Sequence, residues 1–568
     1  MQHLSALPGL YGQCRCRDSW RQDLIVFLTG IARCSVDARA CVGREKGGMM
    51  LRIIRRFIAV AACLCCGCLF AQRTAPIRCT ADLLQFDNDL FPDARMFTGN
   101  VEFSHEGSVG YADTVFYYEK ANRLEAFGKE VIIHINDSVH LYGHSLRYDG
   151  TTRTAVLDGN VMLFDNHSVL YTDLLTFYRS EQYAFYDCGG RIENDSAVLT
   201  SQCGYYYTAT SDAYFRREVH VQHPEFTLDA DTLRYNTREE KVYFSGPTNM
   251  YSDSNSIYCE EGWYATRTEE AVFYGPTRIY AGQYLLTADT LFYDHLHDAG
   301  KAWSNVFLQD TCEKHHVTSD YMEYDGQRCY AFATEKALAV YVQDDDSLFL
   351  HADTLWVTLD SNRHLQSAFC HEHVRFYHSQ YQGRCGSLYY SAIDSLAEMR
   401  DAPLVWNDSS QFVADTFRFF LQQGELRELH LLGAAFVSQN VWEEQSFNQV
   451  KGASMYMYFK DNNPEYMWIY PNAVCLYYME DNDSALIGVQ RTSAERMKVL
   501  FEEGAFSEIL FYQKIKGTFG PEEKGDERFL PGFQWLEPYR PKERSAVFIP
   551  DNYIPAVEQR QPETDEDE

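Results

Sequence analysis

Proline and basic residues are both scarce in this sequence. Only 16 of its 568 residues are proline, whereas 45% are hydrophobic and 15% aromatic, so the chain can bury a core and is not globally disordered. Lys and Arg together number 50 against 81 Asp and Glu, which gives a formal net charge of -31. Because phosphate contacts need clustered Lys and Arg, this balance argues against a nucleic-acid partner. The acidic excess is typical of a long soluble body.

Motifs that mark common catalytic sites are also missing. The sequence has no Gly-rich phosphate loop, no G-x-S-x-G motif and no Cys/His pair in a nucleophile context. Carboxylates are so frequent in this acidic chain that their pairing carries no information about catalysis. We therefore predict no catalytic residue, no cofactor and no enzymatic activity.

One short stretch contains the residue types that bind zinc. In CHEHVRFYH at 370–378, His371 and His373 would share one face of a strand, and Cys370 or His378 would complete a ligand set. Their spacing differs from that of structural zinc sites. We therefore predict that the chain binds no metal.

Long apolar runs are absent except for one near the N-terminus. Three arginines after Met50 precede an apolar run from Phe57 to Phe70, and Ala71 before Gln72 fits a cleavage position. A membrane-spanning helix needs about 20 apolar residues, so this run is too short to be one. The pattern indicates a secretory signal peptide.

The N-terminal segments are assigned from this signal. We predict a signal peptide at residues 50–71 and, before it, an unstructured upstream extension at residues 1–49. A lipoprotein acylated at Cys63 or Cys68 is the alternative.

One strand-like phrase recurs along the rest of the chain. Examples are LTADTLFYD at 286–294, GYADTVFYY at 110–118 and LDADTLRYN at 228–236, which share the pattern A-D-T-L-x-Y. The Asp of this pattern serves as a marker, and its column is occupied every 29 to 33 residues. The marker residues are Asp82, Asp113, His144, Asp173, Gln202, Asp231, Glu260, Asp289, Asp320, Asp353, Gly386 and Asp415. A fixed period of this length indicates a stacked array of one supersecondary unit.

A second phrase follows each marker by about half a repeat. It reads TGNVEF at 98–103, DGNVMLF at 158–164, SGPTNMY at 245–251 and YGPTRIY at 274–280. One unit is therefore strand, turn, strand, turn, with Gly, Asn and Asp at the turns. The small residue before each marker suggests a tight corner. We find no comparable helical periodicity before about residue 490.

This pattern predicts an all-β fold: an elongated β-jellyroll or β-solenoid of stacked two-strand repeats, with 29–33 residues in each repeat. Two architectures fit. One is a parallel β-helix, and the other is an open roll of antiparallel strands whose two sheets face each other. The half-repeat indicates two strands for each step, which favours the antiparallel roll.

Nine cysteines follow the predicted signal peptide, and export would carry them to an oxidising compartment. Cys188 and Cys203 are 15 residues apart, as are Cys370 and Cys385, which is half a repeat and would place each pair on neighbouring strands. Both pairs are candidate disulfides. Because the count is odd, at least one thiol has no partner within the chain.

The A-D-T-L-x-Y phrase, with G-N-V-x-[ILF] half a repeat later, resembles the OstA-like family. This is the domain of the LptA-type periplasmic bridge and of the N-terminal part of the LptD-type outer-membrane translocon. The later stretches FNQVKGASMYMYF, NAVCLYYMEDNDSALIGVQRT and LPGFQWLEPYRP resemble the C-terminal part of long OstA-like proteins of the Bacteroidetes type. We therefore predict an OstA-like β-repeat domain at 76–430, a degenerate continuation at 431–515, and a C-terminal cap with an acidic disordered tail at 516–568.

The resemblance implies a fold and a function. The family fold is an edge-open β-jellyroll that holds the lipid A acyl chains of lipopolysaccharide in an apolar groove. The implied partners are lipopolysaccharide and other transport components at the inner and outer membranes, including an LptD-type barrel, together with end-to-end copies of the chain itself. The implied location is the periplasm, with outer-membrane association as an option.

The resemblance carries over a groove-lining pattern and no catalytic residue. The repeated apolar and aromatic residues of the two phrases are the candidates for this lining. They are Val115, Tyr117, Val161, Leu163, Leu233, Tyr235, Leu291, Tyr293 and Leu355. The same residues would also suit an ordinary core between two packed sheets, since the two look alike in sequence.

Two other functions remain open from the sequence. A β-helical enzyme acting on polysaccharides would need a cluster of acidic residues on adjacent coils that breaks the repeat, and we find none. A passive scaffold or adhesin of the cell envelope would have sheets that pack shut. An open apolar trough would separate the carrier from both.

Overall fold

The computed structural model describes residues 77–549 apart from short gaps. The gaps are residues 88, 90, 92, 106, 136–138, 166–167, 195–196, 208, 225, 237, 253–254, 266, 343–345, 362–363, 423–424, 443–445, 461–462, 481–485, 503–504 and 522–527. The predicted extension at 1–49, the predicted signal peptide at 50–71 and the end of the acidic tail lie outside the described residues. The described chain forms two compact units, an N-terminal unit that ends at Glu335 and a C-terminal unit that begins at Lys336.

The N-terminal unit is built of short and long strands. They are β1 (Arg78–Thr80), β2 (Leu83–Gln85), β3 (Arg95–His105), β4 (Ser108–Tyr118), β5 (Arg123–His134), β6 (Val139–Asp149), β7 (Thr154–Asp165), β8 (Ser168–Tyr178), β9 (Tyr183–Tyr186), β10 (Gly190–Asn194), β11 (Val198–Ser201), β12 (Cys203–Tyr207), β13 (Asp212–His223), β14 (Phe226–Asn236), β15 (Lys241–Tyr251), β16 (Asn255–Ala265), β17 (Glu270–Ala281), β18 (Tyr284–Asp294), β19 (Ala299–Asp310), β20 (His316–Asp325) and β21 (Tyr330–Thr334).

The C-terminal unit continues in the same way and ends in two short 3-10 helices. Its elements are β22 (Leu338–Val342), β23 (Ser347–His351), β24 (Thr354–Leu359), β25 (Leu365–Tyr377), β26 (Tyr381–Ser391), β27 (Leu396–Arg400), β28 (Leu404–Asn407), β29 (Ser410–Val413), β30 (Thr416–Gln422), β31 (Glu425–Trp442), β32 (Ser446–Lys460), β33 (Asn463–Tyr470), β34 (Ala473–Glu480), β35 (Leu486–Ala494), β36 (Arg496–Glu502), β37 (Ala505–Tyr512), β38 (Lys516–Gly520), η4 (Glu537–Tyr539) and η5 (Arg544–Phe548). Within the described residues, no helix has the length and apolar character needed to cross a membrane.

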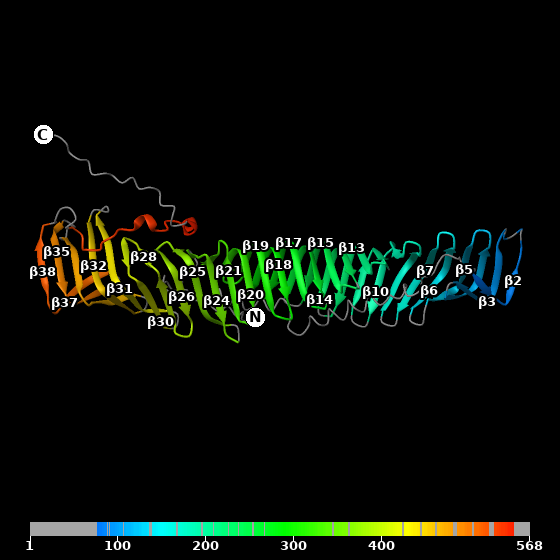
Figure 1. Ribbon diagram of the computed structural model, residues 1–568, viewed down its shortest axis with the longest axis horizontal. Coiled ribbons are helices and arrows are strands. Elements are labelled where there is room, and N and C mark those ends of the chain that lie inside the picture. The colour runs from blue at the N-terminus through cyan, green and yellow to red at the C-terminus, as the bar shows by residue number, and fades with distance from the viewer. Residues whose placement is uncertain are drawn as a thin grey trace, which may run out of the picture. The chain divides into compact units, whose positions relative to one another are not determined.

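Neighbouring strands pair in antiparallel fashion and are joined by hairpins. β17, for example, pairs with β16 on one side and with β18 on the other, and the N-terminal unit repeats this arrangement along its row of strands (Figure 1). Two long strands and two hairpins make up one repeat, as the 29-residue spacing predicts. The antiparallel roll is therefore confirmed, because a β-helix would need parallel pairing.

The Gly-Asn and Gly-Pro phrases do not form the turns that we expected from the sequence. They lie in the middle of long strands, at bulges where the pairing register shifts, such as the shift between Thr98 and Val101 in β3. At this bulge Gly99 and Asn100 have φ of 79° and 44°, in the left-handed region. The hairpins lie elsewhere, at both ends of each strand.

The marker residue lies opposite these bulges and turns the strand through a corner. In β18 the buried residues Ala288 and Leu291 are three apart instead of two, so Asp289 and Thr290 both face outward. A strand alternates its faces with period two, so this break means that the strand bends there. Ala288 is 3% exposed on the inside of the bend, which explains the small residue before the marker.

Glycine is favoured at the first bulge position for two reasons, which Gly246 illustrates. Gly246 has φ of 84°, which side-chain-bearing residues rarely adopt. A Cβ placed on Gly246 would also lie 3.0 Å from the Cβ of Asp231, the marker on the neighbouring strand. The bulge glycine and the marker Asp therefore recur with the same period, because the two residues lie side by side at the same corner.

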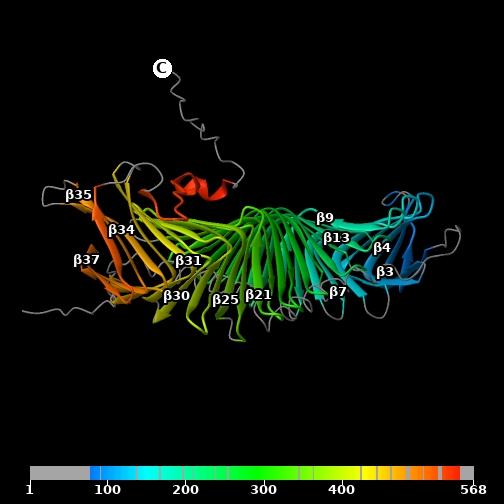
Figure 2. The same ribbon diagram turned by 60° about the vertical axis from the view of Figure 1, so that its left-hand side comes forward.

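Each strand is thus divided by its corner into two halves that lie in two layers. We call the half next to hairpins such as 294–299 arm A, and the half next to hairpins such as 281–284 arm B. In the C-terminal unit, β34 and β35 belong to arm B and β37 belongs to arm A, and Figure 2 shows them in separate layers.

The core lies between the two arms. In the N-terminal unit, buried side chains from Ile77 to Leu291 form one contiguous apolar cluster. In the C-terminal unit, Leu431, Met455 and Ile469 from the three neighbouring strands β31, β32 and β33 of arm A are 0% exposed. Stacking the repeats therefore buries a continuous apolar strip that a lone hairpin could not bury.

The C-terminal segment of residues 528–549, here called the strap, covers the outer face of arm B in the C-terminal unit. Leu530 is buried there against Phe436 and Leu476. The amide of Gln411 accepts a hydrogen bond from the Leu536 N–H at 2.7 Å and donates one to the Gln534 carbonyl at 2.7 Å. Figure 2 shows the strap and its two 3-10 helices in red along this layer.

Gln449 binds the strap in the same way as Gln411. It accepts a hydrogen bond from the Leu530 N–H at 2.8 Å and donates one to the Arg528 carbonyl at 3.1 Å. Farther along, Arg540 donates to the side chain of Gln382 at 2.7 Å. The three glutamines are 0–3% exposed, so the strap satisfies polar groups that would otherwise be buried without partners.

Candidate functional site

In the N-terminal unit, the apolar interior between arms A and B forms one contiguous cluster of buried side chains. Most of the residues that we predicted to line a groove face this interior. Val115, Val161, Leu163, Leu233, Tyr235, Leu291 and Leu355 are 0–6% exposed. The structure therefore brings them into the buried core, where they fill the space between the arms.

Tyr117 and Tyr293, the other two predicted lining residues, are half-buried. Both pack against the core cluster of the N-terminal unit from the hairpin ends of arm A. They lie at the mouth of the roll, which we define as the open side between the hairpins of the two arms. These tyrosines are the predicted lining residues that a molecule entering from the mouth would meet first.

Contacts across the mouth are made by side chains. The Tyr148 hydroxyl lies 3.4 Å from Nδ1 of His105, and their rings are 5.6 Å apart. Tyr148 belongs to arm A of β6 and His105 to arm B of β3, and among the described strands β3 pairs with β1, β2 and β4. The two arms are therefore joined here without a backbone ladder.

A few polar groups lie inside the roll, and they serve its corner. The hydroxyl of Thr248 donates to the carbonyl of Gly246 at 3.1 Å, and Thr277 bonds the carbonyl of Gly275 at 3.3 Å in the same way. Both threonines are at most 2% exposed. Their hydroxyls satisfy carbonyls that the bulge removes from the ladder, so the interior surface stays apolar.

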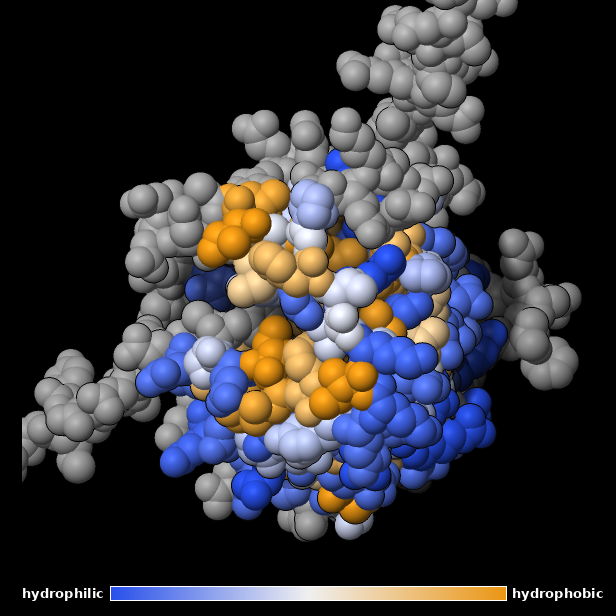
Figure 3. Space-filling view, turned by 90° about the vertical axis from the view of Figure 1, so that its left-hand side faces the viewer, coloured by the Kyte–Doolittle hydropathy of each residue, from blue (hydrophilic) through white to orange (hydrophobic). Residues whose placement is uncertain are grey.

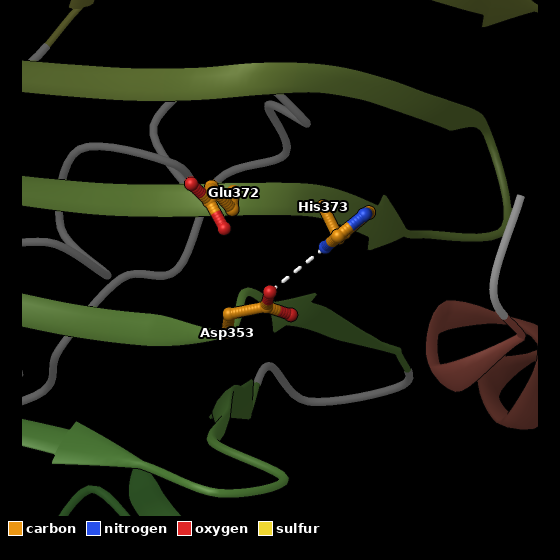
Figure 4. Close-up of side chains that lie close together, drawn as sticks. All are labelled: Asp353, Glu372 and His373. Atoms are coloured by element: carbon orange, nitrogen blue, oxygen red, sulfur yellow. Dashed lines mark hydrogen bonds and ion pairs between the residues drawn. The ribbon is translucent and has the colours of Figure 1, made fainter.

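The outer side of the corner carries charged groups. Asp353, Glu372 and His373 have ligand atoms within 4.8 Å of one another, and all three side chains are exposed (Figure 4). Asp353 is a marker, and Glu372 and His373 occupy the two bulge positions opposite it, with φ of 59° and 49°. This group is an instance of the repeated corner, which accounts for it without a metal.

The zinc set considered from the sequence does not come together. Cys370 is buried in the interior, His371 and His373 are exposed at the corner, and His378 is buried beside Tyr381 with a ring separation of 4.5 Å. His378 instead lies 3.3 Å from a carboxylate oxygen of Asp346.

The four cysteines proposed as disulfide partners are thiols in the structure. Cys370 and Cys385 are both buried, on arms A and B respectively of two paired strands. Cys188 is exposed, while Cys203 is buried at the start of β12. Both pairings stay predictions.

Apolar side chains are exposed at the last strands of the C-terminal unit and at the first strands of the N-terminal unit. At the end of the C-terminal unit, Ile487, Ile515 and Phe519 are 55–57% exposed, and Figure 3 shows hydrophobic residues gathered between hydrophilic margins at this end. At the start of the N-terminal unit, Leu83 and Phe86 are 56% and 63% exposed. Exposed apolar side chains beside terminal strands are typical of surfaces that bind another strand or layer.

Two grooves lie on the outer surface of the N-terminal unit. One of about 570 Å³ is lined by residues of β5 to β8 and by Arg191, with Tyr142 and Tyr171 in its wall. The other, of about 640 Å³, is lined by residues of β13 to β17, including Tyr214, Tyr243 and Trp263. Sequence reasoning missed both grooves, since aromatic residues on the outer face of a strand look like ordinary alternation.

Comparison with known proteins agrees with the resemblance seen in the sequence. Residues 77–231 match the family model described as OstA-like protein. This region is OstA-like. It contains β1 to β13 and the start of β14, and it includes the predicted lining residues Val115, Tyr117, Val161 and Leu163.

A solved structure also matches part of this chain. It is the crystal structure of LptH from Pseudomonas aeruginosa, the LptA-homologous periplasmic component of the conserved lipopolysaccharide transport device. The match has 17% identity and a TM-score of 0.17, and it covers 18% of this chain and 76% of that chain. No curated protein is a significant match to the sequence.

Proposed function

We propose that this protein carries lipopolysaccharide through the periplasm to the outer membrane and holds its acyl chains between arms A and B. The main support is the contiguous apolar interior, which runs from Ile77 to Leu291 without a break in the N-terminal unit. The OstA-like match at 77–231 lies within the same stretch. The proposed activity is transport, and no chemical step is part of it.

The energetics suit a carrier. Each methylene removed from water gains about 0.8 kcal/mol, so one acyl chain gains on the order of 10 kcal/mol from shelter. Equivalent repeats offer it nearly equal environments at successive steps, and a lipid can then move along the roll without falling into a deep trap. The work of moving it would come from another component of the transport system.

Lipid entry requires the arms to part, because side chains fill the interior. The corner is continuous backbone, whereas contacts such as Tyr148 with His105 hold the mouth through side chains alone. A neutral hydrogen bond of this kind contributes only about 1 kcal/mol. The acyl chains would therefore enter at the mouth and replace contacts between the arms with contacts to lipid.

The ends of the roll are the proposed docking sites for other components. Terminal strands such as β38 pair with one described neighbour and expose apolar residues, so a strand of a partner can extend the sheet. The proposed partners are a second copy of this chain and the transport components at the two membranes, including an LptD-type barrel.

Photo-crosslinking in cells tests the proposal. A photoreactive residue at Leu233 or Leu291 faces the interior, and one at Tyr117 faces the mouth. The matched controls are Asp229 and Asp289, exposed residues of the same two strands that point away from the interior. Capture of lipopolysaccharide at the first set and not at the controls supports the carrier. Capture at neither set, or equally at both, contradicts it.

A further inference from the structure

The outer face of arm A carries a ladder of aromatic and basic side chains across five strands. Tyr205, Tyr214, Arg234, Tyr243 and Trp263 lie directly opposite one another in successive pairs from β12 to β16. Strand alternation points all five away from the apolar interior, and none of them belongs to the core cluster. The carrier mechanism makes no use of them.

Basic groups lie over the ring faces along this ladder. The guanidinium carbon of Arg234 is 4.4 Å from the ring centre of Tyr243, and Nζ of Lys241 is 4.3 Å from that of Trp263. Arg216 lies 5.5 Å from the ring centre of Tyr214. Cations at these distances are attracted by the ring faces, and the rings in turn hold them in place.

All of the ladder residues except Tyr205 line the groove of about 640 Å³. This size is within the range of about 300–1,000 Å³ that is typical of small-molecule sites. Three arginines line the groove, Arg216, Arg217 and Arg234, against the two carboxylates of Asp231 and Glu261. Counting Asp212, which lies 3.0 Å from Arg234, three carboxylates balance the three arginines, so anion binding here depends on an arginine without a carboxylate partner.

One of these arginines is free to bind a ligand. Arg234 already forms an ion pair with Asp212 at 3.0 Å. Arg216 is exposed and has no carboxylate partner among the described residues. Its planar, permanently charged guanidinium can bind a carboxylate or phosphate with two parallel hydrogen bonds.

We propose that this groove binds a short acidic oligosaccharide. The C–H faces of sugar rings stack on the flat rings of Tyr214, Tyr243 and Trp263, while the hydroxyl groups keep their contact with water. An acidic group on the sugar pairs with Arg216. The net charge of -31 repels long polyanions, so the ligand is a short glycan with isolated acidic groups.

Single-stranded nucleic acid uses similar stacking and cationic contacts, but its closely spaced phosphates suit this chain less well. The acidic glycan itself could be free or part of a larger glycolipid. Both sources share the same chemistry. A lipid-free sugar therefore tests the groove independently of the interior, and its result does not depend on the carrier proposal.

The test is calorimetric titration of the full-length protein with trigalacturonic acid. We expect binding in the micromolar to millimolar range that is at least tenfold tighter than that of the neutral trisaccharide maltotriose. Arg216→Ala and Trp263→Ala should each weaken binding at least tenfold. The matched control Arg278→Ala removes an exposed arginine of the same unit outside the groove and should leave binding unchanged.

Several results would overturn this proposal. They are no binding of trigalacturonate at millimolar concentration, equal affinity for maltotriose, or equal loss in the Arg278 variant. Tighter binding of a dT oligonucleotide than of trigalacturonate would assign the groove to nucleic acid instead. Because Arg216 is exposed, its variant should keep the wild-type circular dichroism spectrum, so a loss of binding there cannot come from unfolding.

Discussion

The carboxylate of Asp353 accepts a hydrogen bond from Nδ1 of His373 at 2.8 Å, across a corner of the roll (Figure 4). The same relationship joins other markers to the second bulge residue of a neighbouring strand. Asn100 donates to Asp82 at 2.8 Å, and Asn305 donates to Asp289 at 2.7 Å. The repeated Asp therefore serves the corner, which is the one place where every repeat must bend.

The first prediction concerns this corner bond. Asp289→Ala should destabilise the corner by about 0.5–1.5 kcal/mol, because it removes one hydrogen bond to an exposed charged group. Asn305→Asp should have a larger effect, since it places two carboxylates at hydrogen-bond distance. Hydrogen exchange of amides in β18 and β19 measures the local opening free energy.

Asp229→Ala is the control for the corner, since this exposed residue lies on arm B of β14 and is not a marker. It should leave exchange in β18 and β19 unchanged. Equal protection in all three variants would show that the marker column has another role.

The second prediction compares two leucines of one hairpin. Leu291 is 5% exposed in the interior, whereas Leu296 is 55% exposed in the turn that follows β18. Leu291→Ala should cost about 2–5 kcal/mol, because it leaves a cavity between the arms. Leu296→Ala should change stability by less than about 0.5 kcal/mol. Urea denaturation followed by tyrosine and tryptophan fluorescence gives both values.

This comparison also bears on the carrier mechanism. A cavity at position 291 leaves room for hydrocarbon in the closed roll. If lipid enters by parting the arms, Leu291→Ala should lose less stability in the presence of lipopolysaccharide than in its absence. A loss of the same size under both conditions would mean that lipid does not reach this part of the interior.

Periodicity alone predicted much of the fold. The spacing of Asp231, Glu260 and Asp289 gave the two-strand repeat, and alternation gave the inward side of Leu233 and Leu291. The prediction that the Gly-Pro phrase forms a turn was wrong. Glycine has positive φ both in turns and in bulges, so the phrase fits either. The spacing of the phrases cannot distinguish a turn from a bulge, because hairpins and bulges both recur once in every half-repeat.

Contacts between distant segments were beyond sequence reasoning. The strap meets Gln411 and Gln449 across a separation of 79 to 125 residues, and a lone glutamine in a strand gives no hint of a partner. The mouth contact of Tyr148 with His105 also depends on how far the two arms lean toward each other. Whether the predicted lining is core or groove depends on the same separation of the arms, which local pattern does not encode.

The third prediction concerns the strap. Gln411→Ala and Gln449→Ala each remove two hydrogen bonds to backbone groups of the strap, at about 0.5–1.5 kcal/mol for each bond. Hydrogen exchange at Leu530 and Leu536, and cleavage by trypsin within residues 528–549, should both become faster. The rest of the C-terminal unit should keep its protection, because the strap packs on its outer face.

Gln366→Ala is the control for the strap, since this side chain is exposed on arm A of β25. It should leave strap exchange at the wild-type rate. Loss of protection throughout the unit in the Gln411 variant would mean that the strap is an integral part of the core.

The fourth prediction is the reactivity of the cysteines. Burial raises the pKa of Cys370 and of Cys475 to about 12, so almost no thiolate is present at pH 8. Iodoacetamide should therefore label the exposed Cys188 in the native protein and leave both buried thiols unmodified. Peptide mass spectrometry gives the extent of labelling at each site.

The same measurement tests the predicted disulfides. Protein from an oxidising compartment can be denatured and alkylated with and without a reductant. Labelling of Cys370 and Cys385 that needs the reductant would support their pairing, and labelling without it would show two thiols. Fast native labelling of Cys475 would contradict the burial of this residue.

The last prediction is a loss of stability in mild acid. Burial lowers the pKa of His378 and of His351 below the usual value of about 6.5, because the charged imidazolium is desolvated in the folded C-terminal unit. Nδ1 of His378 also accepts a hydrogen bond from the Gln380 N–H at 3.3 Å, which a protonated ring would lose. The unfolded chain therefore binds protons more readily than the folded chain as the pH falls through 6.5.

The sign follows from this difference. The stabilising contribution of each neutral histidine is complete above pH 6.5 and is lost as the pH falls from 6.5 toward the folded-state pKa. The urea midpoint of the C-terminal unit should therefore decrease between pH 7.5 and pH 5.5. His378→Gln should make this decrease smaller, while His364→Gln, at a side chain that is 76% exposed, should leave it unchanged. An equal decrease in the wild type and in the His378 variant would place the acid sensitivity elsewhere in the chain.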